Sequence, residues 1–329
     1  MIERHRARAW LVVFAEVLVL VAGLRLLVDR DPLTGVVGLR WPDDPVILEL
    51  RRIALLAGLI VGAALAISGT LLQSLLRNPL ASPSILGVSS GAALGVIIAL
   101  YAGGAAGGSW LGQTGAACLG ALVVLSLVGG LGRRGGRLDP LSMVLVGVVI
   151  STMASAGIMF VQHLGRETVI RDFTRWMMGR LPEDATGMTI GLTGGMTLLL
   201  GGVAFGLGRA MDASMLGADE ARSVGVSVGR LRLVMFLTAG ALAGVAVVLA
   251  GPIGFVGLSA PHLARLTVGP NHRMLLCAAA LVGATLVVGA DAARQSTDLG
   301  GGRMPIGIFT TLIGGPTFLY LLLTDRSRL

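Results

Sequence analysis

The chain has 329 residues, of which 54% are hydrophobic and 13% charged, and its mean hydropathy is +0.84. These proportions exclude a soluble globular domain and are typical of a polytopic helical membrane protein. All 26 basic residues are arginine, so the chain has no P-loop, because that motif needs a lysine beside the nucleotide phosphates. Any ATP-driven work therefore requires an ATPase on another polypeptide.

Apolar runs of membrane-crossing length recur along the chain and predict an all-α bundle of about ten transmembrane helices, in one domain over residues 1–329. The expected spans are residues 10–28, 53–75, 85–101, 115–131, 141–164, 188–207, 233–249, an eighth after a break at 251–254, 274–293 and 305–323. A basic tail, residues 1–8, precedes the first span, which does not resemble a cleaved signal peptide. Asp139-Pro140 is a helix-start signal before the fifth span.

Residues 62–95, GAALAISGTLLQSLLRNPLASPSILGVSSGAALG, carry the most informative pattern. Ser68 and Gly69 are small residues that would loosen a helix or allow it to pack closely. Pro79 and Pro83 forbid a continuous helix between the second and third spans. Irregular backbone this near the membrane is tolerated only where protein or a water-filled cavity covers it. We therefore expect this turn to lie against protein or a cavity.

Residues 167–180, ETVIRDFTRWMMGR, are amphipathic and are expected to form a short helix on the periplasmic side. Trp176 suits the membrane interface. If this helix borders a substrate path, Arg171, Arg175 and Arg180 would attract an anionic ligand. The alternative is a solvated basic face.

Residues 211–232, MDASMLGADEARSVGVSVGRLR, are the long polar interruption in the second half of the chain. Apolar residues recur there at roughly helical spacing, which predicts two short amphipathic pieces hinged by Gly217, Gly225 and Gly229. An ordinary connection would need only a few residues. We therefore expect a cytoplasmic loop, residues 209–232, on which a soluble partner pushes. The alternative is a solvated loop on the lipid headgroups.

Residues 251–265, GPIGFVGLSAPHLAR, follow the seventh span. Gly251, Pro252 and Gly254 break a helix at membrane depth, where the exposed carbonyl groups must face protein or a cavity. The pattern predicts a pore-lining turn or a packing joint. His262 is expected to be a structural histidine at a helix end.

The sequence offers little for chemistry on this chain. The four histidines are not at coordinating spacing, so no metal, no cofactor and no catalytic residue is expected. Cys118 and Cys277 fall in apolar spans and are expected to be small buried hydrophobes. Glu16 and Asp291 are the acidic residues inside spans, which is few for an ion-gradient-driven transporter or an intramembrane enzyme.

Charges are distributed unevenly between the two ends of the spans. Placing the N-terminus inside puts the arginines of residues 4–8, 133–137 and 209–232 on the cytoplasmic side, and the acidic segments 29–49 and 167–184 outside. This distribution follows the positive-inside rule. We therefore expect a multi-pass protein of the cytoplasmic (inner) membrane with both termini in the cytoplasm. Membrane topology then accounts for the net charge of +8, and no nucleic-acid partner is expected.

Three blocks of this sequence resemble one family. Residues 62–95 resemble the FecCD-type permease signature, approximately GAALAxSGxxxQxxxRNPLAxPxxLGxxxGA, and residues 251–265 resemble GPIxFVGLxxPHxAR. Residues 304–322, MPIGIFTTLIGGPTFLYLL, are similar to LPVGVxTxxxGxPxFxxLL. These permeases are membrane subunits of type II ABC importers for iron-siderophores, haem and cobalamin. The resemblance runs from about residue 50 to the C-terminus.

The resemblance implies that this chain works with other subunits. The expected partners are two copies of an ABC ATPase that uses ATP, a second permease subunit (identical or a paralogue), an extracytoplasmic substrate-binding protein and membrane lipid. Residues 216–226, LGADEARSVGV, are similar to LGxxxAxxLGV, the coupling helices that dock on the ATPase. The residues so assigned to coupling are Leu216, Gly217, Ala218, Asp219, Glu220, Ala221, Gly225 and Val226.

The resemblance also implies a translocation pathway and a docking surface for the binding protein. The expected pathway residues are Trp176, Met177, Arg180, Gly251, Pro252, Ile253, Gly254 and Phe255. Relatives typically show R-L-P-R where this chain has Glu49-Leu50-Arg51-Arg52, and a glutamate where it has Arg303. The residues expected to dock the binding protein are Arg51, Arg52, Arg294 and Arg303, and the alternative is that they are solvated outer-loop charges.

The resemblance is weaker on the substrate. RNPLASPSILG looks most like iron-chelate permeases, so a ferric siderophore is the expected substrate, with haem and cobalamin as alternatives. The alternative class is a secondary transporter driven by an ion gradient, in which Glu16 and Asp291 would be the residues to consider.

Overall fold

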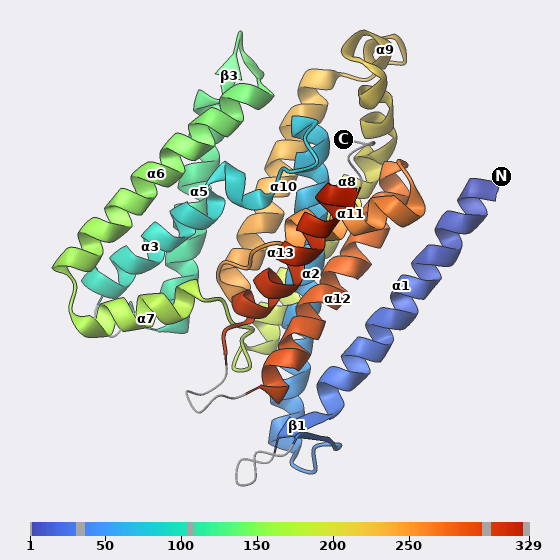
Figure 1. Ribbon diagram of the computed structural model, residues 1–329. Helices are drawn as coiled ribbons and strands as arrows, with labels where there is room; N and C mark the ends of the chain where they lie inside the picture. Colours follow the sequence, from blue (N-terminus) through green and yellow to red (C-terminus); the bar gives the residue numbers. More distant parts are fainter. Residues whose placement is uncertain (1, 31–36, 104–106, 108, 298–303, 325–329) are drawn as a thin grey trace.

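The computed structural model describes residues 2–30, 37–103, 107, 109–297 and 304–324, and these form a helical membrane bundle (Figure 1). Its helices are α1 (Ile2–Leu27), α2 (Pro45–Leu76), α3 (Val88–Ala102), α5 (Trp110–Leu131), α6 (Pro140–Leu164), α7 (Glu167–Met177), α8 (Gly187–Leu216), α9 (Ala218–Ser223), α10 (Val228–Ala250), α11 (Val256–Val268), α12 (His272–Ser296) and α13 (Ile306–Thr324). A short 3-10 helix, η1 (Pro83–Leu86), precedes α3. The strands pair as two small antiparallel hairpins, β1 (Val28–Arg30) with β2 (Val37–Leu39) and β3 (Arg133–Arg134) with β4 (Arg137–Leu138).

Ten of these helices correspond to the ten expected spans. Seven of them (α1, α2, α5, α6, α8, α10 and α12) are long and apolar enough to cross a membrane, and α3 and α13 are shorter apolar helices. The tenth, α11, has 13 residues. At 1.5 Å per residue it is about 20 Å long, which is too short to cross a hydrocarbon core of about 30 Å. The predicted all-α fold is confirmed, with the eighth span reduced to a half-span after the helix break.

Several local expectations differ from the structure. The basic residues after Met1 form no separate tail, because α1 begins at Ile2 and arginine is a good helix former. Gly229 is no hinge, since it lies inside α10. Cys118 is exposed on the outer face of α5, and Cys277 is half-buried. The helix-start signal at Asp139 is confirmed, because its carboxylate accepts a hydrogen bond from the Ser142 amide at 2.9 Å.

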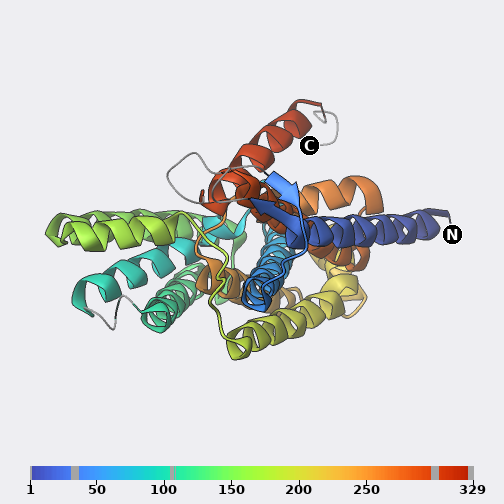
Figure 2. The same cartoon turned by 90° about the horizontal axis from the view of Figure 1, so that it is seen from below.

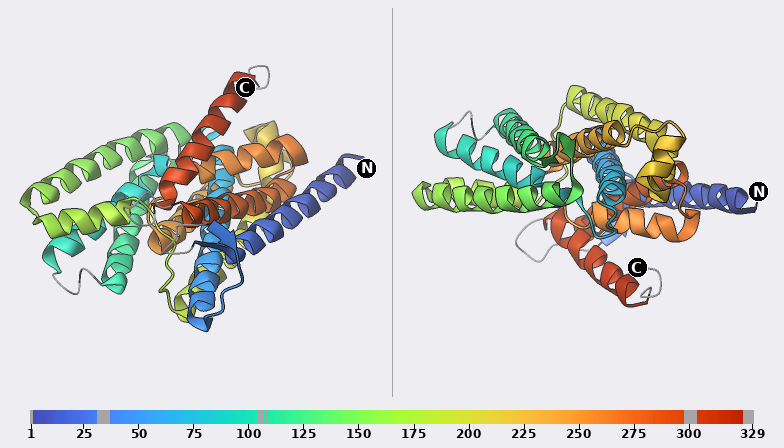
Figure 3. Two further views of the ribbon diagram at one scale, coloured as in Figure 1. Left: turned by 60° about the horizontal axis from the view of Figure 1, so that its bottom comes forward. Right: turned by 90° about the horizontal axis from the view of Figure 1, so that it is seen from above.

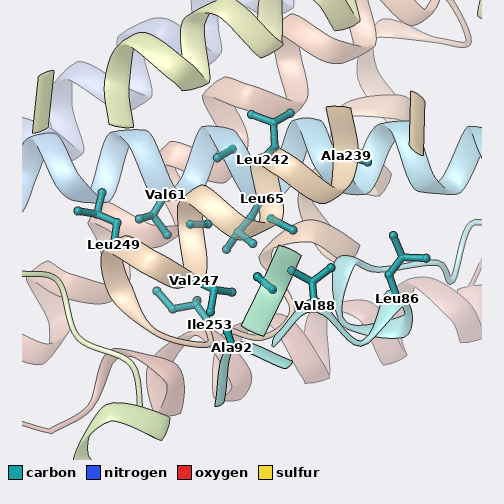
Figure 4. Packing of buried hydrophobic residues seen from close by; sticks show 14 of the residues in the cluster. Val61, Leu65, Leu86, Val88, Ala92, Ala239, Leu242, Val247, Leu249 and Ile253 are labelled. Carbon is teal, nitrogen blue, oxygen red and sulfur yellow. The ribbon is translucent and has the colours of Figure 1, made fainter. Parts of the chain in front are cut away.

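Three helices form the centre of the bundle and the others surround them. In the most apolar 18-residue stretch of each helix, the share of buried residues is 72% for α2, 67% for α10 and 61% for α12. The same share is only 11% for α6 and 6% for α1. The outer helices therefore present apolar faces that match lipid tails. Figure 4 shows side chains of α2 and α10, among them Leu65 and Leu242, packed with Val88 and Ala92 of α3.

Small residues allow α2 to approach its neighbours very closely. A Cβ on Gly62 would collide with the backbone of Gly283 in α12, and one on Gly69 would collide with the carbonyl group of Gly257 in α11. Close approach through glycine is a common means of helix association in membranes. Of the two expectations for Ser68 and Gly69, the structure shows close packing, and Ser68 Oγ also donates to the Ala239 carbonyl oxygen at 2.7 Å.

The two ends of the bundle carry different segments (Figure 1). The N-terminal end of α1, the β3–β4 hairpin and α9 share one end, and the β1–β2 hairpin lies at the opposite end.

Seen along the bundle, α13 projects away from the other helices (Figures 2 and 3). The exposed apolar side chains on α13 are Ile308, Leu312, Ile313, Leu319 and Leu323.

Candidate translocation and coupling sites

A cavity of about 410 Å³ lies where the end of α7, the break before α11 and the first turns of α13 meet. Its lining residues are Met177, Met178, Pro252, Gly254, Gly307, Ile308, Thr311 and Leu312. None of these side chains is charged, and only Thr311 carries a polar group. The volume falls in the range of small-molecule sites, and methionine side chains adapt to irregular shapes. The cavity therefore suits a bulky ligand with a largely apolar surface.

Unusual backbone conformations shape this cavity. Gly179 and Gly251 have φ of 71° and 72°, and a Cβ at Gly251 would meet the Trp176 carbonyl oxygen. The Arg180 amide donates to the Ala250 carbonyl oxygen at 2.8 Å, which joins the end of α7 to the end of α10. Phe255 has φ of 65°, a conformation that is rare for an aromatic residue. Such conformations cluster at functional sites.

The predicted pathway residues are brought together, but in different roles. Met177, Pro252 and Gly254 line the cavity. Trp176 stacks on Phe173 with ring centroids 6.5 Å apart. The remaining predicted residues lie around the cavity as follows: Arg180 is exposed two residues after Met178, Gly251 and Ile253 are buried, and Phe255 lines a much smaller hollow with α13.

Five of the eight lining residues were not among the predicted pathway residues. Met178 is one of them, and the other four, Gly307, Ile308, Thr311 and Leu312, come from the start of α13, about 50 residues after the break before α11. Their position depends on tertiary packing, which no local pattern encodes. The sequence signal that could have pointed to these residues is the block 304–322, because its proline and glycines resemble a family motif.

The segment after α8 is built as a bent helix pair at one end of the bundle. Gly217 has φ of 144° and separates α8 from α9, and Gly225 has φ of 83° and separates α9 from α10. Both were predicted hinges. Leu216 and Val224 are 78% and 68% exposed. Ala221, by contrast, is fully buried and packs α9 onto the bundle.

The other predicted coupling residues divide between these two faces. Asp219 and Glu220 are exposed in the first turn of α9, and Asp219 pairs with Arg222 at 2.7 Å. Gly217, Ala218 and Val226 are partly buried, and Gly225 is exposed. The exposed apolar residues Leu216 and Val224 lie on either side of α9, and exposed apolar side chains grouped at a bundle end suit a protein partner.

A partly buried hydrogen-bond relay lies next to this segment. Asp212 in α8 contacts His272 at the start of α12, with 2.6 Å between carboxylate Oδ1 and imidazole Nδ1. The other imidazole nitrogen, Nε2, lies 2.8 Å from Ser74 Oγ in α2. An ionised carboxylate can only accept, so Nδ1 donates to Asp212, and in neutral His272 Nε2 accepts from Ser74. Nearby, Arg77 donates to the Ser214 carbonyl oxygen at 2.7 Å. The end of α8 is thus tied to α2 and α12.

A buried ion-pair network lies at the opposite end. Asp291 in α12 accepts from Arg25 of α1 and, at 2.8 Å, from Arg294 one turn later. Arg294 also reaches Glu183 at 3.3 Å. Arg25 and Asp291 are each 1% exposed, so the network fixes α1 against α12 inside the bundle.

The predicted docking arginines are not equally available. Arg51 is 6% exposed and pairs with Asp29 at 2.5 Å, and Arg294 is 7% exposed within the network of Asp291. Arg52 is exposed. Arg303 lies outside the described residues.

Within the residues that the structure describes, no three His, Cys, Asp or Glu side chains gather as a metal site would require.

The bundle, with its seven membrane-crossing helices and its half-span, defines a polytopic helical membrane protein. The FecCD transport family model matches residues 17–324, and the chain belongs to this family, whose members are permease subunits of ABC importers. It is 37% identical over 296 residues to the hemin transport permease HmuU of Yersinia pestis, covering 85% of this chain and 84% of that protein. It is 35% identical over 328 residues to the vitamin B12 import permease BtuC of Vibrio vulnificus, covering 99% and 97%.

A solved structure has the same fold. The chain superposes with a TM-score of 0.83 and 32% identity on an inward-facing conformation of a protein described as a metal-chelate type ABC transporter, covering 97% of this chain and 99% of that one. A cobalamin import permease of Halobacterium salinarum is 38% identical over 286 residues, 85% of this chain and 73% of that protein. The chain is therefore an importer permease with a type II fold.

Proposed function

We propose that this chain forms, with a second permease subunit, the pathway for an iron chelate, with a ferric siderophore as the first candidate. An extracytoplasmic binding protein delivers the chelate, and two ATPase subunits drive its movement. The cavity of about 410 Å³ carries the proposal, because Met177, Pro252 and Gly254 meet α13 there. Its apolar lining accepts a bulky ligand without holding it by specific polar contacts.

The charge around the cavity supports an anionic ligand. Arg180 is exposed two residues after the cavity residue Met178, and Arg171 and Arg175 are exposed on α7, which ends at Met177. A guanidinium at the cavity rim attracts carboxylate or hydroxamate groups of a chelate. Haem is the second candidate, because it combines carboxylates with an apolar ring. Cobalamin is the third. The names of the relatives support these two as well, since they include a hemin permease and cobalamin permeases.

The orientation follows from the arginines. We place the end that carries α9 and the N-terminus of α1 in the cytoplasm, and α7 within residues 167–180 on the periplasmic side of the inner membrane. The exposed apolar residues Leu216 and Val224 then face the ATPase. The projecting helix α13 supplies an apolar face for the second subunit, because it stands away from its own bundle (Figure 2). The whole chain acts as one permease domain.

Docking of the binding protein is proposed to depend chiefly on Arg52. This side chain is exposed, whereas Arg51 and Arg294 already have carboxylate partners. An exposed cation on the periplasmic side complements acidic residues on a partner and raises the rate of encounter. Arg51 and Arg294 then hold the outer ends of the helices in place.

The alternative, an ion-gradient-driven transporter, has less support. Asp291 is engaged by two guanidinium groups and is 1% exposed, so it is poorly suited to bind and release an ion. Glu16 is exposed on α1, so it faces away from the bundle interior. A gradient-driven pathway normally uses ionisable groups facing a cavity within the bundle.

Liposomes that contain the importer, with ATP inside and one loaded binding protein outside, test the substrate. We expect uptake of a ferric siderophore, and lower uptake by Arg180→Gln than by the matched control Arg40→Gln, which changes an exposed arginine next to the β1–β2 hairpin. Uptake of haem alone or cobalamin alone would replace the first candidate with that ligand. Equal uptake by the two variants would remove Arg180 from the pathway.

A further inference from the structure

A second cavity, of about 540 Å³, lies at the end of the bundle that carries α9. It is formed where the end of α2, the end of α8 and the last turns of α11 meet. The relay residue Ser74 forms part of its wall. This cavity belongs neither to the proposed pathway nor to the exposed face of the coupling segment, residues 216–226.

The polar part of the lining is cationic. Arg77 and Arg265 both line the cavity, and no Asp or Glu does so among the described residues. The Arg265 side chain is partly buried and makes no hydrogen bond or ion pair with any described residue. Arg77 uses one of its five N–H donors on the Ser214 carbonyl oxygen. Arg265 is a partly buried cation without a counter-charge, and Arg77 is an exposed cation that lines the same cavity, so the pair favours an anion.

Other lining groups indicate what kind of anion fits. Asn78 Oδ1 accepts from the Leu80 amide at 2.9 Å, which leaves the Asn78 amide NH2 as a donor at the cavity. Met215 and Leu266, at the rim, are 46% and 43% exposed. The site therefore combines several donors with an apolar edge. A ligand that carries both an anionic group and hydrocarbon matches both parts.

The backbone at Arg77 supports a binding role. Arg77 has φ of 48°, the left-handed conformation, and its amide donates to the Gln73 carbonyl oxygen, which ends α2. A non-glycine residue held in this conformation is strained, and such strain clusters at functional sites. The end of α2 thereby fixes the Arg77 backbone at the mouth of the cavity.

We propose that this cavity binds the phosphate headgroup of an anionic phospholipid, between Arg77 and Arg265, with its acyl chains along Leu266 and Met215. Guanidinium groups bind phosphate through paired hydrogen bonds, and basic pockets between membrane helices at the cytoplasmic side are sites for such headgroups. A bound lipid would lie against Met215, two residues before the Gly217 hinge. The site does not depend on which chelate is transported.

Native mass spectrometry of the assembled importer tests this proposal with phosphatidylglycerol and phosphatidylcholine as probes. We expect the wild-type importer to retain phosphatidylglycerol selectively. The double variant Arg77→Gln with Arg265→Gln should bind it at least about tenfold more weakly, the loss expected for charge-assisted hydrogen bonds. The matched control is Arg134→Gln, an exposed arginine of the β3–β4 hairpin at the same end.

A second variant, Leu266→Glu, keeps both arginines and places a carboxylate at the rim, so it should also weaken retention even if the double variant folds poorly. Equal retention by the double variant and the Arg134→Gln control would overturn the proposal. Displacement of the lipid by millimolar inorganic phosphate or ATP would assign the site to a soluble phosphate instead. Loss of the ATPase subunit from the variants, with unchanged lipid retention, would assign it to an acidic side chain of that partner.

Discussion

His272 and Asp212 are 60 residues apart in the sequence, yet imidazole Nδ1 and carboxylate Oδ1 lie 2.6 Å from each other. Asp212 precedes the Gly217 hinge by little more than one helical turn, and His272 begins the central helix α12. The backbone amide of His272 also donates to the same carboxylate oxygen, at 3.0 Å. The end of α8 is therefore connected to the first turn of α12 by two hydrogen bonds, and through His272 Nε2 to Ser74 of α2. We propose that movement of residues 216–226 is transmitted to the bundle along these bonds.

Substitution of the relay histidine should weaken coupling. His272→Phe keeps the ring volume and removes both side-chain hydrogen bonds, and the loss of a buried partner costs about 1–3 kcal/mol. We expect transport per ATP hydrolysed to fall by roughly tenfold, with ATP hydrolysis retained. The control Ser223→Ala removes a hydroxyl that bonds only within α9, and it should transport normally. Normal coupling in His272→Phe would show that the relay is only structural.

Leu216 and Ala221 should respond differently to a charge, although the sequence assigned both to coupling. Leu216→Glu changes a 78% exposed side chain, so the protein should insert and fold while transport is uncoupled from ATP hydrolysis. Ala221→Glu places a carboxylate at a fully buried position, which should detach α9 from the bundle. Protease digestion separates the two, because only the second variant should become sensitive near residue 221. Arg134→Glu is the control for added charge at this end.

The apolar cavity can be blocked from α13. Thr311→Trp adds a large ring to the lining, so uptake should be lost while the loaded binding protein still stimulates ATP hydrolysis. The control Leu199→Trp adds the same ring to the exposed, lipid-facing side of α8, where it should have little effect. Full uptake by Thr311→Trp would place the pathway elsewhere.

The ion-pair network at the end opposite α9 should contribute strongly to stability. Asp291→Asn leaves the buried Arg25 without a carboxylate partner and Arg294 with Glu183 alone. Removing one partner of a buried pair costs about 3–5 kcal/mol. The control is Asp43→Asn, since the exposed pair of Asp43 with Arg40 should contribute no more than about 1 kcal/mol. Thermal unfolding in detergent compares the two variants, and similar midpoints would contradict this view of the network.

The sequence predicted the local features and missed those that depend on tertiary packing. The all-α bundle, the glycine hinges at Gly217 and Gly225 and the break at 251–254 were readable, because apolar length, glycine and proline act within a few residues. The arginines that line the cavity beside Ser74, the α13 side of the apolar cavity and the relay through His272 were not. Their members come together only when helices distant in sequence pack side by side.

The energy source for uptake can be measured in liposomes that contain this permease and its ATPase. We expect accumulation to require both ATP inside and a loaded binding protein outside and to be independent of proton and sodium gradients. Leu216→Glu should abolish accumulation while ATP hydrolysis continues. Accumulation without ATP that follows an ion gradient and is lost in Asp291→Asn, under conditions where that variant is folded, would contradict ATP-driven uptake.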